Sequence, residues 1–190
     1  MRSMLRPTVT RVTQMDGSVT LEQGDTIVSV SPTDHSSPGY IVDTSPDLGV
    51  DRILPWLHMS SQDVAAHQQL LQDHGITHIL NVGSGIDIHR DSWSWRVEER
   101  RVEMLDIPEQ SIDKAMAESF EYLELCHESG ANVLVHCNAG VSRSATVVIG
   151  YLMEHHNMTY DQAHQVVKTK RPCIRPNEGF VTQLKERDKS

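Results

Sequence analysis

The sequence has little of three things: cysteine, positive charge and long apolar runs. Three cysteines occur in 190 residues, and 17 Lys and Arg stand against 26 Asp and Glu, for a net charge of −9. No apolar run approaches the roughly 18 residues of a membrane-spanning helix. Sparse cysteines without an apolar leader also exclude a secreted disulfide framework. We therefore expect an intracellular protein, in the cytoplasm or the nucleus.

The acidic balance and the histidine spacing exclude further classes. A nucleic-acid-binding protein normally presents clustered Lys and Arg, so we expect no nucleic-acid partner, and we expect no membrane partner. Eleven histidines are scattered without a metal-site spacing, and the adjacent His155 and His156 cannot share a helix face. We expect no metal and no cofactor.

Composition changes near residue 49. Residues 1–48 are rich in Thr, Ser, Asp, Gly and Pro, with short strand-like pieces such as 25–30, and we expect a mostly irregular N-terminal extension. After it, strands are predicted at 52–59 (broken at Pro55), 77–82, 101–105 and 132–136, and helices at 60–75, 113–129, 142–156, 159–170 and 178–187. This alternation predicts one α/β domain over 49–190, with a mainly parallel or mixed sheet covered by helices on both faces.

The stretch VHCNAGVSRSA at 135–145 carries most of the functional signal. Cys137 stands between a fully apolar strand and a helix, and the small residues that follow it include Gly140. Such a loop can turn several N–H groups toward one centre at a helix N-terminus, where the dipole favours an anion and the thiolate form of a cysteine. Arg143 can hold two oxygens of a phosphate. The stretch therefore predicts a sulfur nucleophile beneath an oxyanion cradle, acting on a phosphate ester.

The order His136-Cys137-x-x-Gly140-x-x-Arg143-Ser144 resembles the signature of the cysteine-dependent protein phosphatases. NAGVSRS followed by RPCIRPNEGF resembles the dual-specificity phosphatases, and the short domain with PWLHMSSQD and LDIPE resembles their small atypical members. The resemblance covers about residues 49–187. It implies the cysteine-phosphatase fold and hydrolysis of phosphotyrosine and phosphoserine or phosphothreonine through a phosphocysteine intermediate.

The resemblance also implies the roles of the loop residues. Cys137 attacks phosphorus, Arg143 and the loop amides hold the oxygens, and the hydroxyl of Ser144 assists departure of the sulfur. Because the loop is uncharged, a singly phosphorylated side chain suits it better than a polyanionic lipid head group. The expected substrate-binding residues are Asn138, Ala139, Gly140, Val141, Ser142 and Arg143, with the Ser142 side chain in a structural role.

Cleavage of the ester also needs a proton for the leaving oxygen. In this family an aspartate about thirty residues before the cysteine supplies it. Asp106 lies 31 residues before Cys137, after the predicted strand 101–105, and is the expected general acid. Asp113 is the alternative, although N-capping already explains an aspartate at a helix start.

Four other residues near the motifs are expected to have structural or surface positions rather than catalytic roles. His136 is expected to bond to backbone and shape the loop. Asn177 is expected to cap the helix 178–187 and to brace the loop. Arg171 and Arg175 could approach the substrate, but we interpret both as solvated surface.

The expected function is thus a dual-specificity protein phosphatase whose partners are phosphorylated proteins. The resemblance implies kinases of mitogen-activated protein kinase pathways among them. The alternative is a phosphatase-like scaffold that binds kinases without turnover, although degenerate members usually lose the cysteine or the arginine and this chain keeps Cys137 and Arg143. An RNA triphosphatase on the same fold is a weaker rival, because the loop is neutral and the chain is acidic.

Overall fold

The computed structural model describes residues 9–13, 19–23, 26–30, 46–85, 88 and 90–188. The chain divides into two compact units, Met1–Pro46 and Asp47–Ser190. In the first unit, β1 (Val9–Thr13), β2 (Val19–Gln23) and β3 (Thr26–Val30) form an antiparallel sheet in sequence order. Most of the remaining stretches expected to be irregular within 1–48 lie outside the described residues.

The second unit is built on a five-stranded sheet with the order β4-β5-β8-β6-β7. Its strands are β4 (Asp51–Arg52), β5 (Leu57–Ser60), β6 (His78–Asn81), β7 (Glu98–Arg101) and β8 (Val133–His136). All neighbours pair in parallel except the antiparallel edge strand β4. Parallel neighbours need crossover connections. Those from β5 to β6 and from β7 to β8 contain helices, whereas the described residues between β6 and β7 form none. The predicted mixed sheet is confirmed.

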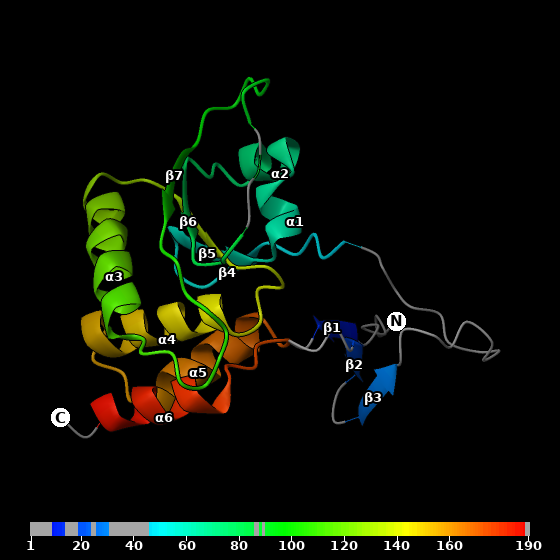
Figure 1. The fold of residues 1–190 in the computed structure, drawn as a ribbon. Helices are drawn as coiled ribbons and strands as arrows, with labels where there is room; N and C mark the ends of the chain where they lie inside the picture. Colours follow the sequence, from blue (N-terminus) through cyan, green and yellow to red (C-terminus); the bar gives the residue numbers. More distant parts are fainter. Residues whose placement is uncertain are drawn as a thin grey trace, which may run out of the picture. The chain divides into compact units, whose positions relative to one another are not determined.

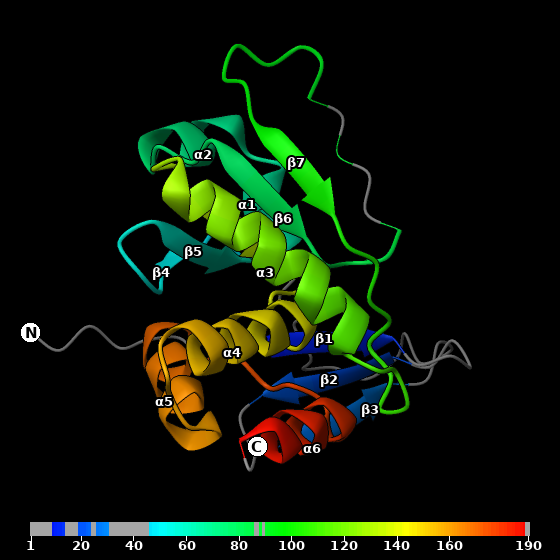
Figure 2. The ribbon, with the colours of Figure 1, turned by 90° about the vertical axis from the view of Figure 1, so that its left-hand side faces the viewer.

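Helices cover both faces of this sheet (Figure 1 and Figure 2). The bounds are α1 (Gln62–Ala65), α2 (Gln68–Asp73), α3 (Asp113–Glu128), α4 (Arg143–His155), α5 (Tyr160–Lys170) and α6 (Glu178–Arg187). Successive strand residues point to opposite faces. Accordingly, Leu134 of β8 packs in the smaller core cluster with residues of α1 and α2, whereas Val133 and Val135 pack in the larger one with α3, α4, α5 and α6.

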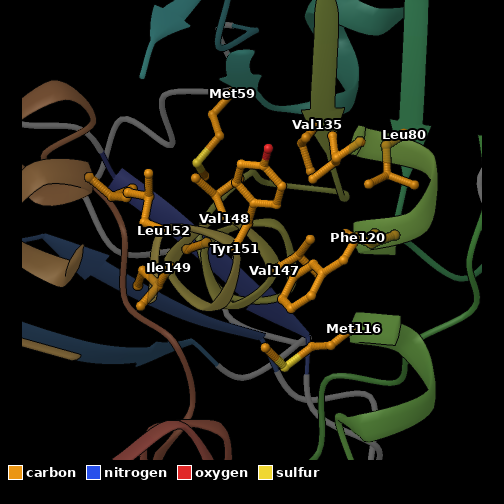
Figure 3. Close-up of a cluster of buried hydrophobic side chains, with 14 of the residues drawn as sticks. Met59, Leu80, Met116, Phe120, Val135, Val147, Val148, Ile149, Tyr151 and Leu152 are labelled. Carbon is orange, nitrogen blue, oxygen red and sulfur yellow. The ribbon is translucent and has the colours of Figure 1, made fainter. Parts of the chain in front are cut away.

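The larger core surrounds α4, whose residues Ser144 to Leu152 are all buried. Figure 3 shows Val147, Val148 and Leu152 of this helix among side chains from the sheet and from α3, such as Phe120. A helix that is apolar nearly all round belongs in a protein interior. Its buried position holds its first residue, Arg143, in a defined place after the loop that follows β8. Within the described part of the chain, no helix is both long and apolar enough to cross a membrane.

Two predicted boundaries were wrong. The helix expected at 60–75 is interrupted after Ala65, and a second helix begins at Gln68 with the ring of His67 accepting from the Leu70 N–H. The strand expected at 101–105 is β7, which ends at Arg101. The register explains the second difference, because the partner strand β6 ends at Asn81 opposite Arg101 and the next residues have no strand to pair with.

Candidate active site

The loop of residues 137–142, called here the Cys137 loop, connects the end of β8 to the start of α4. Gly140 has a φ of +68°, in the left-handed region that glycine adopts without strain. A Cβ atom there would lie 2.3 Å from the Ser60 carbonyl oxygen at the end of β5. Both the backbone conformation and the close approach to β5 therefore require glycine at this position.

Cys137 lies at the base of the loop, with only 2% of its surface exposed. Its Sγ is 3.4 Å from the Oγ of Ser144, which is fully buried in the first turn of α4. The loop leads into the N-terminus of α4, where the helix dipole favours a bound anion. The structure thus brings together the expected nucleophile and the hydroxyl that was expected to assist it.

Arg143 extends back across the loop from the start of α4. Its Nη2 donates to Asn138 Oδ1 at 2.6 Å and its Nη1 to the Met104 carbonyl at 3.4 Å. Its Nε lies 3.6 Å from Asp106 Oδ2, is buried, and has no hydrogen-bond partner among the described residues. A buried guanidinium with an unused donor is suited to receive an anion.

Asp106 lies beside the same loop, although it precedes it by 31 residues. Its Oδ1 accepts hydrogen bonds from Ser142 Oγ at 2.7 Å and from Asn177 Nδ2 at 2.8 Å. The Asn177 backbone N–H donates to Ser142 Oγ at 3.2 Å, so the three residues form a closed network. The side-chain amide oxygen of Asn177 caps α6 by accepting from the Phe180 N–H at 3.0 Å.

The segment that carries Asp106 also packs on α6. A Cβ on Gly179 would lie 2.0 Å from the Pro108 carbonyl oxygen, which shows how closely the two backbones approach. Gln183 accepts from the Ile112 N–H at 3.1 Å and donates to the Gln110 carbonyl at 2.9 Å. Nothing local in the sequence identifies Gly179 and Gln183, because their contacts are with a segment about seventy residues earlier.

Asp113, the alternative to Asp106, is held elsewhere. It is the first residue of α3 and contacts Ser111 Oγ at 3.2 Å and the guanidinium of Arg187. The side chain that reaches the Cys137 loop in the structure is that of Asp106.

His136 supports the loop from its other side and is completely buried. Burial lowers the pKa of its imidazole to about 4, so the ring is neutral at pH 7. Its Nδ1 lies 3.0 Å from the Cys137 carbonyl oxygen, which a neutral ring can contact only by donating from that nitrogen. The ring is thus bonded to backbone and is not arranged as a general base.

The interpretation of Arg171 as solvated surface was wrong. Its surface is 2% exposed, and its guanidinium donates to the carbonyls of Ala139 and Gly140 and pairs with Asp47 and Asp51. The two carboxylates precede it by 124 and 120 residues, so no local pattern could have shown the pairing.

Arg175 lies at the surface, and its backbone N–H donates to the Val141 carbonyl at 2.9 Å. This contact ties the segment between α5 and α6 to the Cys137 loop.

The comparisons with known proteins agree with this geometry. Residues 57–190 match the family model described as dual specificity phosphatase, catalytic domain. The chain is 39% identical to dual specificity protein phosphatase 19 of Mus musculus over 188 residues, which cover 97% of this chain and 84% of that protein. PWLHMSSQD, THILNV and LDIPE are among the segments that suggest this resemblance.

Two further similarities are more distant. The chain is 37% identical to dual specificity protein phosphatase 1 of Arabidopsis thaliana over 70% of this chain and 66% of that protein. The crystal structure of human DUSP28 superposes with a TM-score of 0.67 at 30% identity, covering 74% of this chain and 93% of that one. Several other curated relatives are much longer, and the chain spans 22–28% of their length.

The matched segment contains the Cys137 loop, Asp106 and all of α3 to α6. The mixed sheet with helices on both faces agrees with the solved structure. The chain therefore belongs to the dual specificity protein phosphatases, and it carries the catalytic domain of that class of hydrolase.

Proposed function

We propose that the protein cleaves phosphate monoesters of proteins in two steps at the Cys137 loop. In the first step, Cys137 Sγ attacks phosphorus and the bond to the side-chain oxygen of the substrate breaks. Arg143 and the amides of Asn138, Ala139, Gly140, Val141 and Ser142 stabilise the phosphoryl oxygens. Asp106, in its protonated form, gives its proton to the leaving oxygen.

In the second step, water attacks the phosphocysteine and inorganic phosphate leaves. Asp106 is now ionised and takes a proton from that water, so the proton lost in the first step is recovered. Ser144, at 3.4 Å from the sulfur, donates a hydrogen bond to the departing thiolate. The guanidinium and the loop amides supply the charge stabilisation that metal ions give to other phosphatases, and the thiolate supplies the nucleophile.

The observation that carries this proposal is the convergence of three groups from three segments on one loop. Cys137 directly follows β8, Arg143 begins α4, and Asp106 comes from the connection between β7 and α3. Asp106 contacts both Ser142 and Arg143, which supports a role for its carboxyl group beside the sulfur and the guanidinium.

We further propose phosphotyrosine and phosphoserine or phosphothreonine proteins as substrates, among them proteins of mitogen-activated protein kinase pathways. The support for the pathway is the family resemblance. We place the protein in the cytoplasm or the nucleus, where a reducing environment keeps a catalytic thiol active. Residues 49–190 form the catalytic domain in this proposal, and residues 1–48 form an N-terminal extension.

The test is hydrolysis of a small aryl phosphate in EDTA with a reducing agent, with the wild type and Cys137→Ser side by side. We expect turnover by the wild type and loss of at least about 10³-fold in the variant, because a hydroxyl at this position is not ionised. Absence of turnover by folded, reduced wild type would instead favour the phosphatase-like scaffold. Neither the matched family model nor the curated relatives described above support that alternative.

A further inference from the structure

The Cys137 loop accepts hydrogen bonds at four consecutive carbonyls, those of residues 138–141, and the last of these is the contact with the Arg175 N–H described above. The Asn138 carbonyl accepts from the Gln62 backbone N–H at 2.9 Å. The Ala139 and Gly140 carbonyls accept from Arg171 Nη2 at 3.1 Å and Nε at 2.7 Å. One buried guanidinium therefore holds two adjacent peptide groups of the loop.

Because a peptide group is planar, a contact that fixes a carbonyl also fixes the direction of the N–H group of the next residue. In a trans peptide, the C=O of one residue and the N–H of the next point in opposite directions. When Arg171 draws the carbonyls of Ala139 and Gly140 outward, the N–H groups of Gly140 and Val141 must point the other way. That direction is toward the centre of the loop, where a phosphoryl group would bind.

Arg171 itself is held by two carboxylates. Its Nη1 is 2.7 Å from Asp51 Oδ2 and its Nη2 is 2.5 Å from Asp47 Oδ2. The Arg171 side chain is 3% exposed, and those of Asp47 and Asp51 are 33% and 26% exposed. A guanidinium this deeply buried needs such partners, because an unpaired charge is costly away from water.

The two carboxylates lie before the segment that matches the family model, which begins at residue 57. Asp47 is anchored in turn, because its carbonyl accepts from Ser61 Oγ at 2.8 Å and its N–H donates to Asp63 at 3.0 Å. Ser61 and Asp63 flank Gln62, which donates to the Asn138 carbonyl. The carbonyls of residues 138–140 are therefore bound by a single connected network from residue 47 to residue 63 together with Arg171.

We propose that Arg171, held by Asp47 and Asp51, is a positioning residue that orients the Gly140 and Val141 amides toward the bound phosphoryl group. This proposal rests on the proposed function, since it assigns the orientation of the oxyanion donors of that site. Arg171 does not touch the substrate. Its loss should weaken the binding of the phosphoryl oxygens in the ground state, and more strongly in the transition state, where negative charge on them is stabilised by the amides.

A purely structural role for Arg171 makes a different prediction. It would lower the melting temperature but leave the folded fraction with normal phosphate affinity and normal kcat/KM. The orienting role predicts a specific loss at two amides in protein that is still folded. Measurements of phosphate affinity and kcat/KM well below the melting temperature therefore distinguish the two roles.

The experiment compares the full-length wild type with Arg171→Met, Arg171→Lys and the control Lys170→Met. Lys170 is the adjacent, exposed last residue of α5, so its substitution removes the same charge without touching the loop. Inorganic phosphate is the probe. Its binding is measured in two-dimensional ¹H–¹⁵N NMR spectra and as its inhibition constant in the hydrolysis of an aryl phosphate.

In the wild type, phosphate should move the amide signals of Gly140 and Val141 downfield. In Arg171→Met these two shifts should fall by at least about half, the inhibition constant should rise about 10-fold or more, and kcat/KM should fall about 10²-fold, the range for loss of oxyanion donors. Arg171→Lys should recover part of this loss, because an ammonium can reach one carbonyl but lacks the planar fork. Lys170→Met should behave as the wild type.

Normal phosphate affinity and intact Gly140 and Val141 shifts in folded Arg171→Met would overturn the proposal. If that variant does not fold, the test uses Asp51→Asn instead. This variant keeps Arg171 and removes the charge from one of its two carboxylate partners. A rise of about 3-fold or more in its phosphate constant supports the orienting role, and an unchanged constant overturns it. Wild-type protein that neither binds phosphate nor hydrolyses the ester would instead refute the proposed function itself.

Discussion

Two arginines flank the same loop and are used in opposite ways. Arg143 begins α4 and contacts the side chains of Asn138 and Asp106, leaving its Nε without a hydrogen-bond partner among the described residues. Arg171 is almost fully buried, and its partners are two backbone carbonyls and two carboxylates. An arginine with an unused donor can receive a ligand, whereas one whose donors all end on the protein supports the structure around it.

The strongest way to test this contrast is to replace each arginine by lysine. Arg143→Lys should lower kcat/KM for every phosphate ester by about 10³-fold or more, since it removes the planar fork from the transition state. Arg171→Lys should lower it by only about 10-fold. Steady-state kinetics on one aryl phosphate checks both, and equal losses in the two variants would remove the distinction.

Asp106→Asn extends the comparison of the two arginines to a residue of another role. It removes the proton donor of the reaction and leaves the groups that bind the phosphoryl oxygens. We expect a loss of about 10²–10⁴-fold for substrates with a poor leaving group, such as an alkyl phosphate or phosphoserine peptide. The loss should nearly vanish for an activated aryl phosphate, whose leaving oxygen needs no proton. A loss that is independent of the leaving group would contradict the role of Asp106 as general acid.

Asn177→Ser tests whether the network around Asp106 holds that carboxyl in place. Serine keeps the cap of α6 but loses the Nδ2 donor to Asp106 Oδ1. We expect a loss of about 10-fold in kcat for poor leaving groups, and much less for an activated aryl phosphate. The same substitution in Asp106→Asn should have almost no further effect, because the two residues act through one group.

The Cys137 loop and the two arginines also show what sequence can and cannot reveal. Cys137, Gly140 and Arg143 stand within seven residues, so their relation is visible in the chain as a strand, a turn and a helix start. The site of Arg171 depends on Asp47 and Asp51, more than a hundred residues earlier, and its sequence context is only a charged helix end. Burial of a charge is a long-range property, and no local pattern encodes it.

The difference between local and long-range contacts also explains which predicted element boundaries were right and which were wrong. The capping box at Thr159 and Gln162 and the cap at Asn177 are local, and both helices begin where the sequence predicts. Strand β7 ends at Arg101 because its partner β6 ends there, although Val102 and Met104 continue to alternate as buried residues beyond it. Their alternation suggested a strand at 101–105, but ladder pairing depends on a segment twenty residues away.

A prediction on stability rather than on rate concerns His136, which is buried directly before Cys137. Its folded pKa of about 4 lies below the ordinary value of 6.5, so the unfolded chain binds a proton first as pH falls. The stability that this group contributes is complete above pH 6.5 and is lost as pH falls toward 4, by about 3 kcal/mol. Urea unfolding of the wild type and His136→Gln at several pH values checks this, and equal acid sensitivity in both would contradict it.

The central claim is that Cys137 carries the phosphoryl group between the two steps. The most direct measurement is rapid acid quenching of Ser144→Ala during turnover of an aryl phosphate, followed by peptide mass spectrometry. Loss of the hydroxyl beside the sulfur should slow the second step, so the peptide containing Cys137 should gain the mass of one phosphoryl group. Turnover with no phosphorylated peptide, or with phosphate on another residue, would contradict the account.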